Sequence, residues 1–231
     1  MFLLTRPLSG SLSMAKVFTS CKIPFHIEPL LSITLRELPS LEGYKTIVIT
    51  SHYALACLKS LPRDTYVYCV GASLEQQIRQ LGISNVIQKP SVEMLLKELK
   101  KDSPDFVGSI LYVSGNVITQ DIESVLAPLG YSVTRQVVYL TSPAASFSRK
   151  TLEYLNAHSI NSVCFFSKKT AEIFMQLMDQ HGLGAHYSYL RAFSFSAAIS
   201  QSLQKVSWKE VLTSVNPSMN SFWNLIENHV G

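Results

Sequence analysis

Small polar residues collect where apolar, strand-like runs of this sequence pass into helix-like patterns. The turns concerned are residues 5–6, 50–51, 71–73, 114–116, 167–169 and 196, and they are nearly free of carboxylates. Backbone N–H groups at helix starts bind anions well, because they offer unpaired donors and the positive end of the helix dipole. The pattern therefore predicts a surface that holds carboxylates through backbone N–H groups and hydroxyls instead of one decisive cation.

A purely structural role is the alternative at each of these positions taken singly. A Ser or Thr at such a turn is also a good helix N-cap, which stabilises a protein by about 1 kcal/mol without any ligand. Gly71 and Gly115 serve either close backbone approach to a ligand or a positive φ. Neither glycine belongs to a phosphate-binding loop, because the GxGxxG and P-loop patterns do not occur in the sequence.

Metal and nucleophile motifs are missing from the sequence. The six histidines show no metal-ligand spacing, and neither an HExxH pattern nor a nucleophile elbow occurs. No local Ser–His–Asp constellation can be read either. We expect no metal site. The scattered cysteines predict buried thiols without a disulfide framework: Cys21, Cys57, Cys69 and Cys164.

The elements that must position the polar turns alternate along the chain. Strands are expected at residues 2–5, 46–50, 66–70, 109–114 and 162–167. Helical periodicity covers residues 118–129, which Gly130 follows, and residues 170–181, which Gly182 follows. Such alternation predicts an α/β fold with parallel sheets. In that fold ligands bind beyond the carboxyl ends of the strands, which is where the polar turns lie.

Two parts of the sequence read as copies of one design. Residues 45–58 and 161–174 both run from an apolar strand through Ser into an Ala-containing helix, and a further strand and helix follow each, at 70–78 and 193–203. The repetition predicts two similar three-layer α/β domains. The alternative is a chance resemblance, because strand–Ser–helix is a common arrangement. Extended segments at residues 27–38 and 136–143 break the pattern. We interpret them as connectors or edge strands.

Bulk properties narrow the class of protein. With 47% hydrophobic and 16% charged residues among 231, the chain can bury a core and is globular. Its apolar runs fall short of the ~20 residues of a membrane-spanning helix, and its first ten residues lack the order of a secretion signal. We expect a cytoplasmic protein without membrane contact. The net charge of +4 suits an anionic small molecule, and the dispersed Lys and Arg residues argue against nucleic acid.

The order and spacing of several short motifs resemble the uroporphyrinogen-III synthase family along nearly the whole chain. The motifs are LLTRP, EPLLSI, VITSHYA, VGASLEQQIRQLG, SGN, LGYSVTRQVVYLT and FFSKKTAEIF. The resemblance implies two α/β domains joined by a two-stranded β connector. One domain would comprise residues 1–29 plus 144–231, the other residues 37–136, and the connector strands residues 30–36 and 137–143. It further implies a monomer that needs no cofactor.

The resemblance also implies a reaction. The substrate would be hydroxymethylbilane, a linear tetrapyrrole with eight carboxylates, and the product uroporphyrinogen III of heme biosynthesis. Loss of hydroxide gives an azafulvene cation, the substituted carbon of ring D attacks, and a spiro intermediate reopens and closes with that ring inverted. Because the substrate closes spontaneously to the unrotated isomer, the enzyme must above all hold the bent geometry that favours attack at the crowded carbon.

Site residues carried over from the resemblance fall on the polar turns. Tyr139 matches a tyrosine beside the family's cleft, and its hydroxyl would hydrogen-bond the departing hydroxide; the alternative is an aromatic that packs a connector strand. The residues expected to line the substrate cleft are Arg6, Ser51, Gly71, Ala72, Ser73, Gly115, Asn116, Ser167, Lys168 and Ser196. The chain departs from the family's usual residues at Leu74, Thr119, Ser196 and Ile199, which weakens this residue list.

Two other classes of function fit part of the same pattern. A non-enzymatic two-domain α/β binding protein for an anionic small molecule would share the polar turns and hold no catalytic group. A flavodoxin-like or nucleotide-binding regulator would grip a phosphate at one helix N-terminus. The 10 glycines and the absence of a dense glycine-rich loop argue against the regulator.

Overall fold

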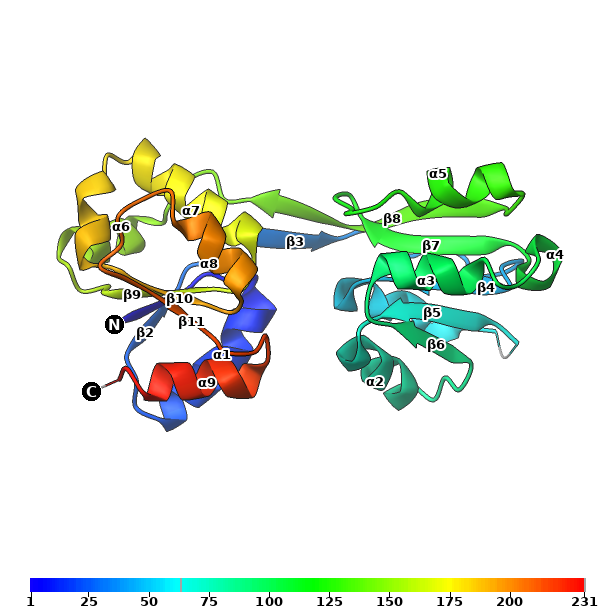
Figure 1. Ribbon diagram of the computed structural model, residues 1–231, viewed down its shortest axis with the longest axis horizontal. Coiled ribbons are helices and arrows are strands. Elements are labelled where there is room, and N and C mark those ends of the chain that lie inside the picture. Colours follow the sequence, from blue (N-terminus) through cyan, green and yellow to red (C-terminus); the bar gives the residue numbers. More distant parts are fainter. Residues whose placement is uncertain (63, 231) are drawn as a thin grey trace. The chain divides into compact units, whose positions relative to one another are not determined.

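The computed structural model describes residues 1–62 and 64–230, and the chain divides into two compact units. Unit 1 comprises Met1–Ser32 and Ser142–Gly231, and unit 2 comprises Ile33–Thr141. Unit 2 is therefore continuous in the sequence and interrupts unit 1. Each unit is built around its own sheet of mainly parallel strands (Figure 1).

The sheet of unit 1 is five-stranded within the described residues, in the order β11-β10-β9-β1-β2. Every neighbouring pair in it is parallel. The strands are β1 (Phe2–Leu4), β2 (Phe25–Ile27), β9 (Ser162–Phe165), β10 (Arg191–Ser194) and β11 (Glu210–Thr213). The first strand of the chain thus lies inside the sheet, between β2 and β9.

The sheet of unit 2 is six-stranded within the described residues, in the order β3-β8-β7-β4-β5-β6. The pairs from β8 to β6 are parallel. The strands are β3 (Leu31–Leu35), β4 (Thr46–Ile49), β5 (Tyr66–Val70), β6 (Val86–Lys89), β7 (Ile110–Gly115) and β8 (Val133–Pro143). Strands β3 and β8 each continue across the boundary between the two units.

Helices cover both faces of each sheet, which gives three layers. The helices of unit 1 are α1 (Leu8–Ser20), α6 (Arg149–Asn156), α7 (Lys168–Gln180), η3 (Gly184–Tyr189), α8 (Ala197–Leu203) and α9 (Met219–Glu227). The helices of unit 2 are η1 (His52–Ser60), α2 (Ala72–Gln80), α3 (Val92–Leu99), α4 (Pro104–Val107), α5 (Ile122–Leu126) and η2 (Ala127–Leu129). The prediction of an α/β fold with parallel sheets is confirmed.

The cores follow from the alternation of side chains along fully buried strands. In β1 of unit 1, Leu3 packs with α7 and α8, whereas Leu4 packs with α1 and α9. In β4 of unit 2, Ile47 packs with η1 and α2, whereas Val48 packs with α3 and α5. Each sheet therefore separates two hydrophobic clusters. Because both faces are covered, the strands read as continuous apolar runs in the sequence.

Two helical segments differ from the expected ones. The periodic stretch 118–129 contains a helix only from Ile122, because Asp121 caps it by accepting a hydrogen bond from the Ser124 N–H at 3.2 Å. Its last turn, Ala127–Leu129, is 3₁₀ and ends at Gly130 with φ 87°. The stretch after Ser51 is also 3₁₀ and not α-helical. No helix in the described part of the chain is both long and apolar enough to cross a membrane.

Candidate functional site

Each sheet has one point at which the chain connections diverge in opposite directions. In unit 1, β1 leads through α1 to β2 on one side, and β9 leads through α7 to β10 on the other. In unit 2, β4 leads through η1 to β5 and β7 leads through α5 to β8. At such a switch point the helices leave to opposite faces, and the carboxyl ends of the two strands frame a crevice that binds ligands. The switch point of unit 1 therefore lies between β1 and β9, and that of unit 2 between β4 and β7.

The switch point of unit 1 brings Arg6 and Ser167 to one edge of the sheet. Arg6 follows β1, and its guanidinium carbon lies 4.5 Å from the centre of the Phe166 ring. Thr5, which is fully buried, donates from Oγ1 to the carbonyl of Cys164 at 2.7 Å and ties the ends of β1 and β9 together. A guanidinium stacked on an aromatic face keeps its charge while its apolar surface is covered.

Ser167 also has the structural role considered above. Its side chain caps α7 by accepting a hydrogen bond from the Thr170 N–H at 3.1 Å. Lys168, the first residue of α7, is exposed. Ser196 precedes α8 in the N-cap position, but its side chain forms no capping bond. The hydroxyl of Ser196 is therefore less committed to the fold than that of Ser167.

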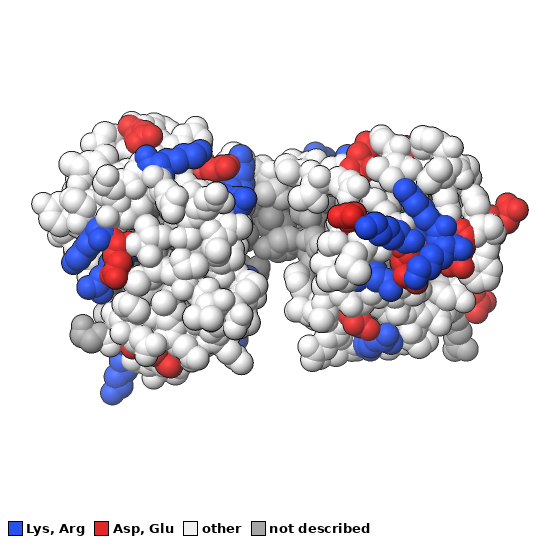
Figure 2. All heavy atoms as spheres, in the orientation of Figure 1, with Lys and Arg blue, Asp and Glu red and all other residues white. Residues whose placement is uncertain are grey.

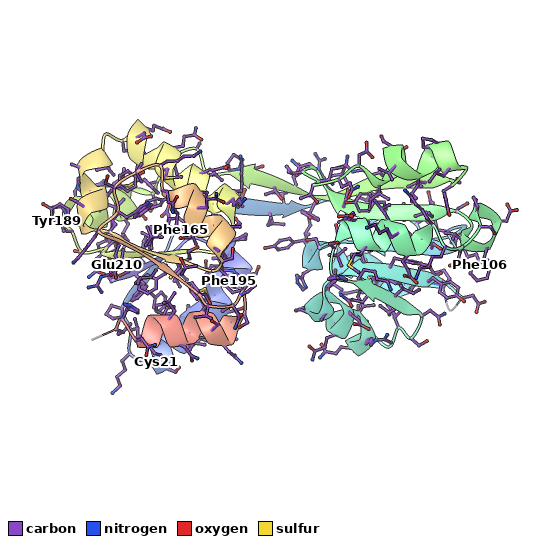
Figure 3. All side chains as sticks on the ribbon, viewed as in Figure 1. Cys21, Phe106, Phe165, Tyr189, Phe195 and Glu210 are labelled. Carbon is purple, nitrogen blue, oxygen red and sulfur yellow. The ribbon has the colours of Figure 1, made fainter. Side chains whose placement is uncertain are left out.

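Aromatic rings at this edge were missed in the sequence analysis. Phe166 and Phe195 follow β9 and β10 directly, both are half-buried, and their ring centres lie 5.1 Å apart. Phe222 of α9 packs beneath them, with its ring centre 4.6 Å from that of Phe166. Figure 3 labels Phe195 together with the core residue Phe165 of the neighbouring strand. The available signal was a Phe directly after each strand run, Phe166 before Ser167 and Phe195 before Ser196.

The switch point of unit 2 brings Ser51 and the turn of residues 114–116, here called the β7 turn, to one edge of the second sheet. Strands β4 and β7 are hydrogen-bonded neighbours that run parallel from Thr46 and Ile110. Ser51 is half-buried and accepts a hydrogen bond from the Tyr53 N–H at 3.3 Å. Both positions expected from the sequence therefore lie at the carboxyl edge of the second sheet.

Tyr139 reaches this edge through a β-bulge. In the β7–β8 register Ser114 pairs with Val137 and Gly115 pairs with Tyr139, so Val138 is the extra residue. A bulge turns two successive side chains to similar directions. Val138 and Tyr139 accordingly both contact the η1 side of the sheet. Regular alternation would have placed them on opposite faces.

Gly115 makes room for the Tyr139 ring. A Cβ atom at Gly115 would lie 2.5 Å from Cε2 and 2.9 Å from the hydroxyl oxygen of Tyr139. Tyr139 is 8% exposed, its ring centre lies 5.5 Å from that of Tyr53, and its hydroxyl forms no hydrogen bond with a described residue. Gly115 does not have the positive φ that was one of its two expected roles, and the structure gives a third reason for the glycine, its contact with the Tyr139 ring.

Asn116 fastens the β7 turn to β8. Its backbone N–H donates to the Tyr139 carbonyl at 3.1 Å. Its side-chain Oδ1 accepts from the Thr141 N–H at 2.8 Å, and Nδ2 donates to the Thr141 carbonyl at 3.4 Å. Both side-chain atoms of Asn116 are thus occupied by backbone. The residue positions the strand that carries Tyr139.

Arg135 is a second residue that the sequence analysis missed. It lies on β8 opposite Tyr112, and its guanidinium donates to Ser114 Oγ at 2.9 Å and to the carbonyls of Gly115 at 2.8 Å and Asn116 at 3.2 Å. A planar fork with several donors suits such a set of converging acceptors. Arg135 lies within the TRQVVYLT motif, but the sequence does not show that its side chain contacts the turn after a neighbouring strand.

Tyr112, buried inside β7, has a perturbed phenol. Burial raises the pKa of its hydroxyl, while a hydrogen bond with Thr50 and the nearby charge of Arg135 act in the opposite direction. The group stays protonated at neutral pH. It links the ends of β4 and β7 through Thr50.

The turn after β5 has a different geometry. Gly71 stands at the N-cap position of α2 with φ 92°, and a Cβ atom there would meet nothing within 4 Å. Its positive φ, which other residues rarely adopt, is the reason for the glycine. Ala72 and Ser73 are exposed at the start of α2, on the same edge of the parallel sheet as the β7 turn. Their backbone N–H groups belong to the first turn of the helix and have no partner within it.

Other polar and ionisable features lie away from these edges. A cavity of about 390 Å³ in unit 2 is lined by residues that precede β5 and β6, including Thr65 and Asn85, and so lies at the amino ends of the strands. Figure 2 shows Lys and Arg mixed with Asp and Glu on the drawn face of unit 2. Among the ion pairs of unit 2, Lys97 pairs with Glu93 at 2.9 Å and Lys101 with Glu98 at 2.8 Å. Within residues 1–62 and 64–230 no group of His, Cys, Asp and Glu side chains has the arrangement of a metal site.

The four cysteines are free thiols, and three of them are buried. The prediction of buried thiols is confirmed for Cys57, Cys69 and Cys164 and is wrong for Cys21, which is exposed at the end of α1. Burial raises the pKa of the Cys69 thiol to about 11, and it also raises the pKa of the fully buried Cys164 thiol. Such thiols carry little thiolate and react slowly.

Comparison with known proteins adds independent information. A family model described as "Uroporphyrinogen-III synthase HemD" matches residues 24–224. The uroporphyrinogen-III synthetase structure from Helicobacter pylori is similar with a TM-score of 0.61 and 16% identity, over 89% of this chain and 93% of that one. A mutant uroporphyrinogen III synthase from Thermus thermophilus gives a TM-score of 0.59 and 13% identity, over 99% and 97% of the two chains. No curated protein sequence gives a significant match.

Proposed function

Because the chain belongs to the uroporphyrinogen-III synthase family, whose model matches residues 24–224, we propose that it cyclises hydroxymethylbilane to uroporphyrinogen III with inversion of ring D. The family consists of cyclising lyases of tetrapyrrole and heme biosynthesis. The observation that carries the proposal for this chain is the set of donor-rich turns at the switch points of both sheets. We further propose that the protein acts as a monomer in the cytoplasm.

The polar turns supply what an eight-carboxylate substrate requires. In unit 1 they contribute Arg6, Ser167, Lys168 and Ser196, and in unit 2 Ser51, Gly71, Ala72, Ser73, Gly115 and Asn116. Backbone N–H groups and hydroxyls provide most of the contacts, since two side chains of this set, Ser167 and Asn116, already hydrogen-bond backbone. Many distributed donors also fix the shape of a flexible ligand better than a single ion pair does.

The half-buried aromatic edge of unit 1 suits the pyrrole rings. Phe166 and Phe195 present apolar faces beside the Arg6 guanidinium. Pyrroles stack on aromatic rings, and the azafulvene cation formed after loss of hydroxide is stabilised by an aromatic face. This edge thus combines a surface for rings with a cation for their carboxylate side chains.

Tyr139 is the proposed acid partner of the leaving group. Its hydroxyl has no hydrogen-bond partner among the described residues and lies over Gly115 at the edge of the unit 2 sheet. A phenol in that position donates a hydrogen bond to the departing hydroxide and lowers the barrier to azafulvene formation. The ring is held by Tyr53 on one side and by the Gly115 backbone on the other.

The rearrangement itself demands positioning more than strong acid–base chemistry. The conversion expels one water molecule and involves no net oxidation or reduction, so its stoichiometry requires no redox cofactor. The spontaneous reaction forms the unrotated isomer, and the enzyme must therefore hold the chain so that the substituted carbon of ring D attacks first. Reopening of the spiro intermediate and closure at the other carbon then invert the ring.

A coupled assay tests the proposal. Hydroxymethylbilane is generated in situ, the products are oxidised to porphyrins, and isomers I and III are separated chromatographically with and without the protein. We expect predominantly isomer III. Isomer I alone, from protein shown by circular dichroism to be folded, would overturn the proposal and favour a non-enzymatic binding protein for an anionic small molecule.

A further inference from the structure

Arg135 is an arginine whose positive charge no described carboxylate neutralises. Its Nε and Nη2 atoms bind neutral acceptors, namely Ser114 Oγ and the carbonyls of Gly115 and Asn116. The ion pairs between described residues do not include it. Arg135 is half-buried, so its guanidinium loses part of its hydration. No attraction to an opposite charge compensates this loss.

Asp121 interacts with Arg135 electrostatically but does not neutralise its charge. Arg135 contributes to lowering the pKa of Asp121, but the main cause is the pair of hydrogen bonds that Asp121 receives from Ser124. Those bonds, from the Ser124 N–H at 3.2 Å and hydroxyl at 2.6 Å, fix the Asp121 carboxylate at the N-cap of α5. The carboxylate is therefore engaged by the helix it caps.

The guanidinium is also fixed at the ligand-binding edge. Three hydrogen bonds to the β7 turn hold its plane, and Nη1 forms no hydrogen bond with a described residue. A fixed guanidinium that keeps N–H groups unengaged by its own fold is preorganised for a carboxylate. Ser114, whose hydroxyl accepts a hydrogen bond from Arg135, is 1% exposed, so this contact is buried within the fold.

Resting on the proposed function, we propose that Arg135 is a substrate-binding and specificity-determining residue, which holds one acetate or propionate carboxylate of the tetrapyrrole at the β7 turn. A carboxylate bound there is tied through Gly115 and Asn116 to the strand that carries Tyr139. Arg135 thereby sets the register of the substrate relative to Tyr139. Loss of that register releases the substrate to close spontaneously as isomer I.

The principal test compares Arg135→Gln and Arg135→Lys with Arg79→Gln as the matched control. Arg79 is an arginine of the same unit that donates to two backbone carbonyls, those of Ser84 and Val86, but is paired with Glu75. For Arg135→Gln we expect KM to rise about tenfold or more, kcat to change less than about threefold, and the fraction of isomer III to fall. Arg135→Lys recovers part of the affinity, because it keeps the charge but not the fork. Arg79→Gln leaves all three quantities unchanged.

Salt dependence separates binding from a purely structural clamp. KM of the unaltered protein rises with ionic strength because charge–charge contacts are screened, and its slope is smaller in Arg135→Gln. A fall in kcat at unchanged KM and unchanged salt slope would overturn the inference, since it would describe a residue that only supports the turn.

A variant-free measurement covers the case in which Arg135→Gln does not fold. Phenylglyoxal modifies accessible arginines, and mass spectrometry of the peptides reports each site. We expect uroporphyrinogen III, kept reduced, to protect Arg135 but not Arg79. Equal modification of Arg135 with and without it would refute the inference.

Calorimetric titration with reduced uroporphyrinogen III keeps the two proposals apart. If binding of uroporphyrinogen III depends on Arg135 but no isomer III is formed, the enzymatic proposal is overturned, and Arg135 keeps only its role in binding a carboxylate. If the unaltered protein forms isomer III but the Arg135→Gln variant binds uroporphyrinogen III as tightly as it does, the enzymatic proposal stands and the role of Arg135 is refuted.

Discussion

The hydroxyl of Tyr139 can be removed without removing its ring. Because the ring packs against Tyr53 and Gly115 while the hydroxyl has no partner among the described residues, Tyr139→Phe preserves the packing. We expect kcat to fall about 10- to 100-fold and the free energy of unfolding to change by less than about 0.5 kcal/mol. Steady-state kinetics and urea unfolding measure the two quantities. Unchanged turnover would remove Tyr139 from the catalytic machinery.

The contact between Gly115 and Tyr139 predicts a strong effect for the smallest possible substitution. In Gly115→Ala the new methyl group must displace the Tyr139 ring, from which it would otherwise lie 2.5 Å. We expect a loss of about 1–3 kcal/mol in the free energy of unfolding, accompanied by loss of activity. Gly184→Ala is the control, because a Cβ there meets nothing within 4 Å and the backbone φ is not positive. Similar stability of the two variants would contradict the predicted clash.

His26 is expected to make the stability of unit 1 depend on pH. It lies at the edge strand β2, where its Nε2 is 2.9 Å from Thr151 Oγ1 and 3.8 Å from the buried Glu28 carboxylate. Burial lowers its pKa, Glu28 acts in the opposite direction, and the Lys150 charge lowers the pKa further. Tyr154 packs against the ring, with the ring centres 5.2 Å apart.

A lowered pKa in the folded state fixes the sign of the effect on stability. Below the ordinary histidine pKa of about 6.5 the unfolded chain binds the proton first, so the free energy of unfolding falls as the pH decreases below that value. Urea unfolding between about pH 7.5 and pH 5 measures the slope. In His26→Gln this part of the slope disappears. An equally steep slope in that variant would assign the dependence to other groups.

At the scale of elements, two helix starts of unit 1 provide a matched pair. Ser167 caps α7 with a hydrogen bond to the Thr170 N–H, whereas Ser196 precedes α8 without a capping bond. Ser167→Ala should cost about 1 kcal/mol of unfolding free energy, and Ser196→Ala almost none. Chemical denaturation of both variants tests this difference. If Ser196→Ala instead raises KM while Ser167→Ala only lowers stability, the two serines have divided the structural and the ligand-binding roles.

The pattern of elements explains what was predictable. Apolar strand runs such as those of β4 and β9, followed by small polar residues, fixed the α/β class and placed Ser51 and Ser167 at carboxyl edges. These features depend on local periodicity and on the rules of parallel sheets, both of which are visible in a sequence. Membership of the uroporphyrinogen-III synthase family is confirmed by the match over residues 24–224. The proposed site residues and domain boundaries stay predictions.

Other features depended on contacts that periodicity does not encode. The bulge at Val138 turns Tyr139 onto the η1 side of its sheet, which simple alternation from Arg135 would not give. Arg135 reaches the β7 turn around a strand end, and the Phe166–Phe195 surface joins two strands. Each of these requires knowledge of which strands are neighbours and in which register they pair.

At the scale of the whole molecule, the two sheets have one arrangement with different starting points in the chain. The order β11-β10-β9-β1-β2 of unit 1 corresponds to β6-β5-β4-β7-β8 of unit 2. In this correspondence β9 matches β4 and β10 matches β5, which are the segments that read as copies in the sequence. The two units are thus related as circular permutants, and the insertion of unit 2 follows β2.

Unit 2 should fold by itself, because it is continuous and has a core on both faces of its sheet. A polypeptide of residues 31–143, which keeps β3 and β8 at full length, is expected to unfold cooperatively with urea. Residues 144–231 alone lack β1 and its fully buried Leu3 and Leu4, and are expected to remain without fixed tertiary structure. Cooperative unfolding of the latter polypeptide would contradict the dependence of unit 1 on β1.

The position of β1 inside its sheet also determines which of the two units can be completed first during translation. A ribosome releases β1 and β2 early, but β9, the neighbour that covers the other edge of β1, begins only at Ser162. During that interval the whole of unit 2 is synthesised, while the apolar strand Phe2–Leu4 lacks its partner β9. The unit whose first strand is made first is therefore completed after the other, and its strand β1 is exposed to wrong pairing until β9 has been synthesised.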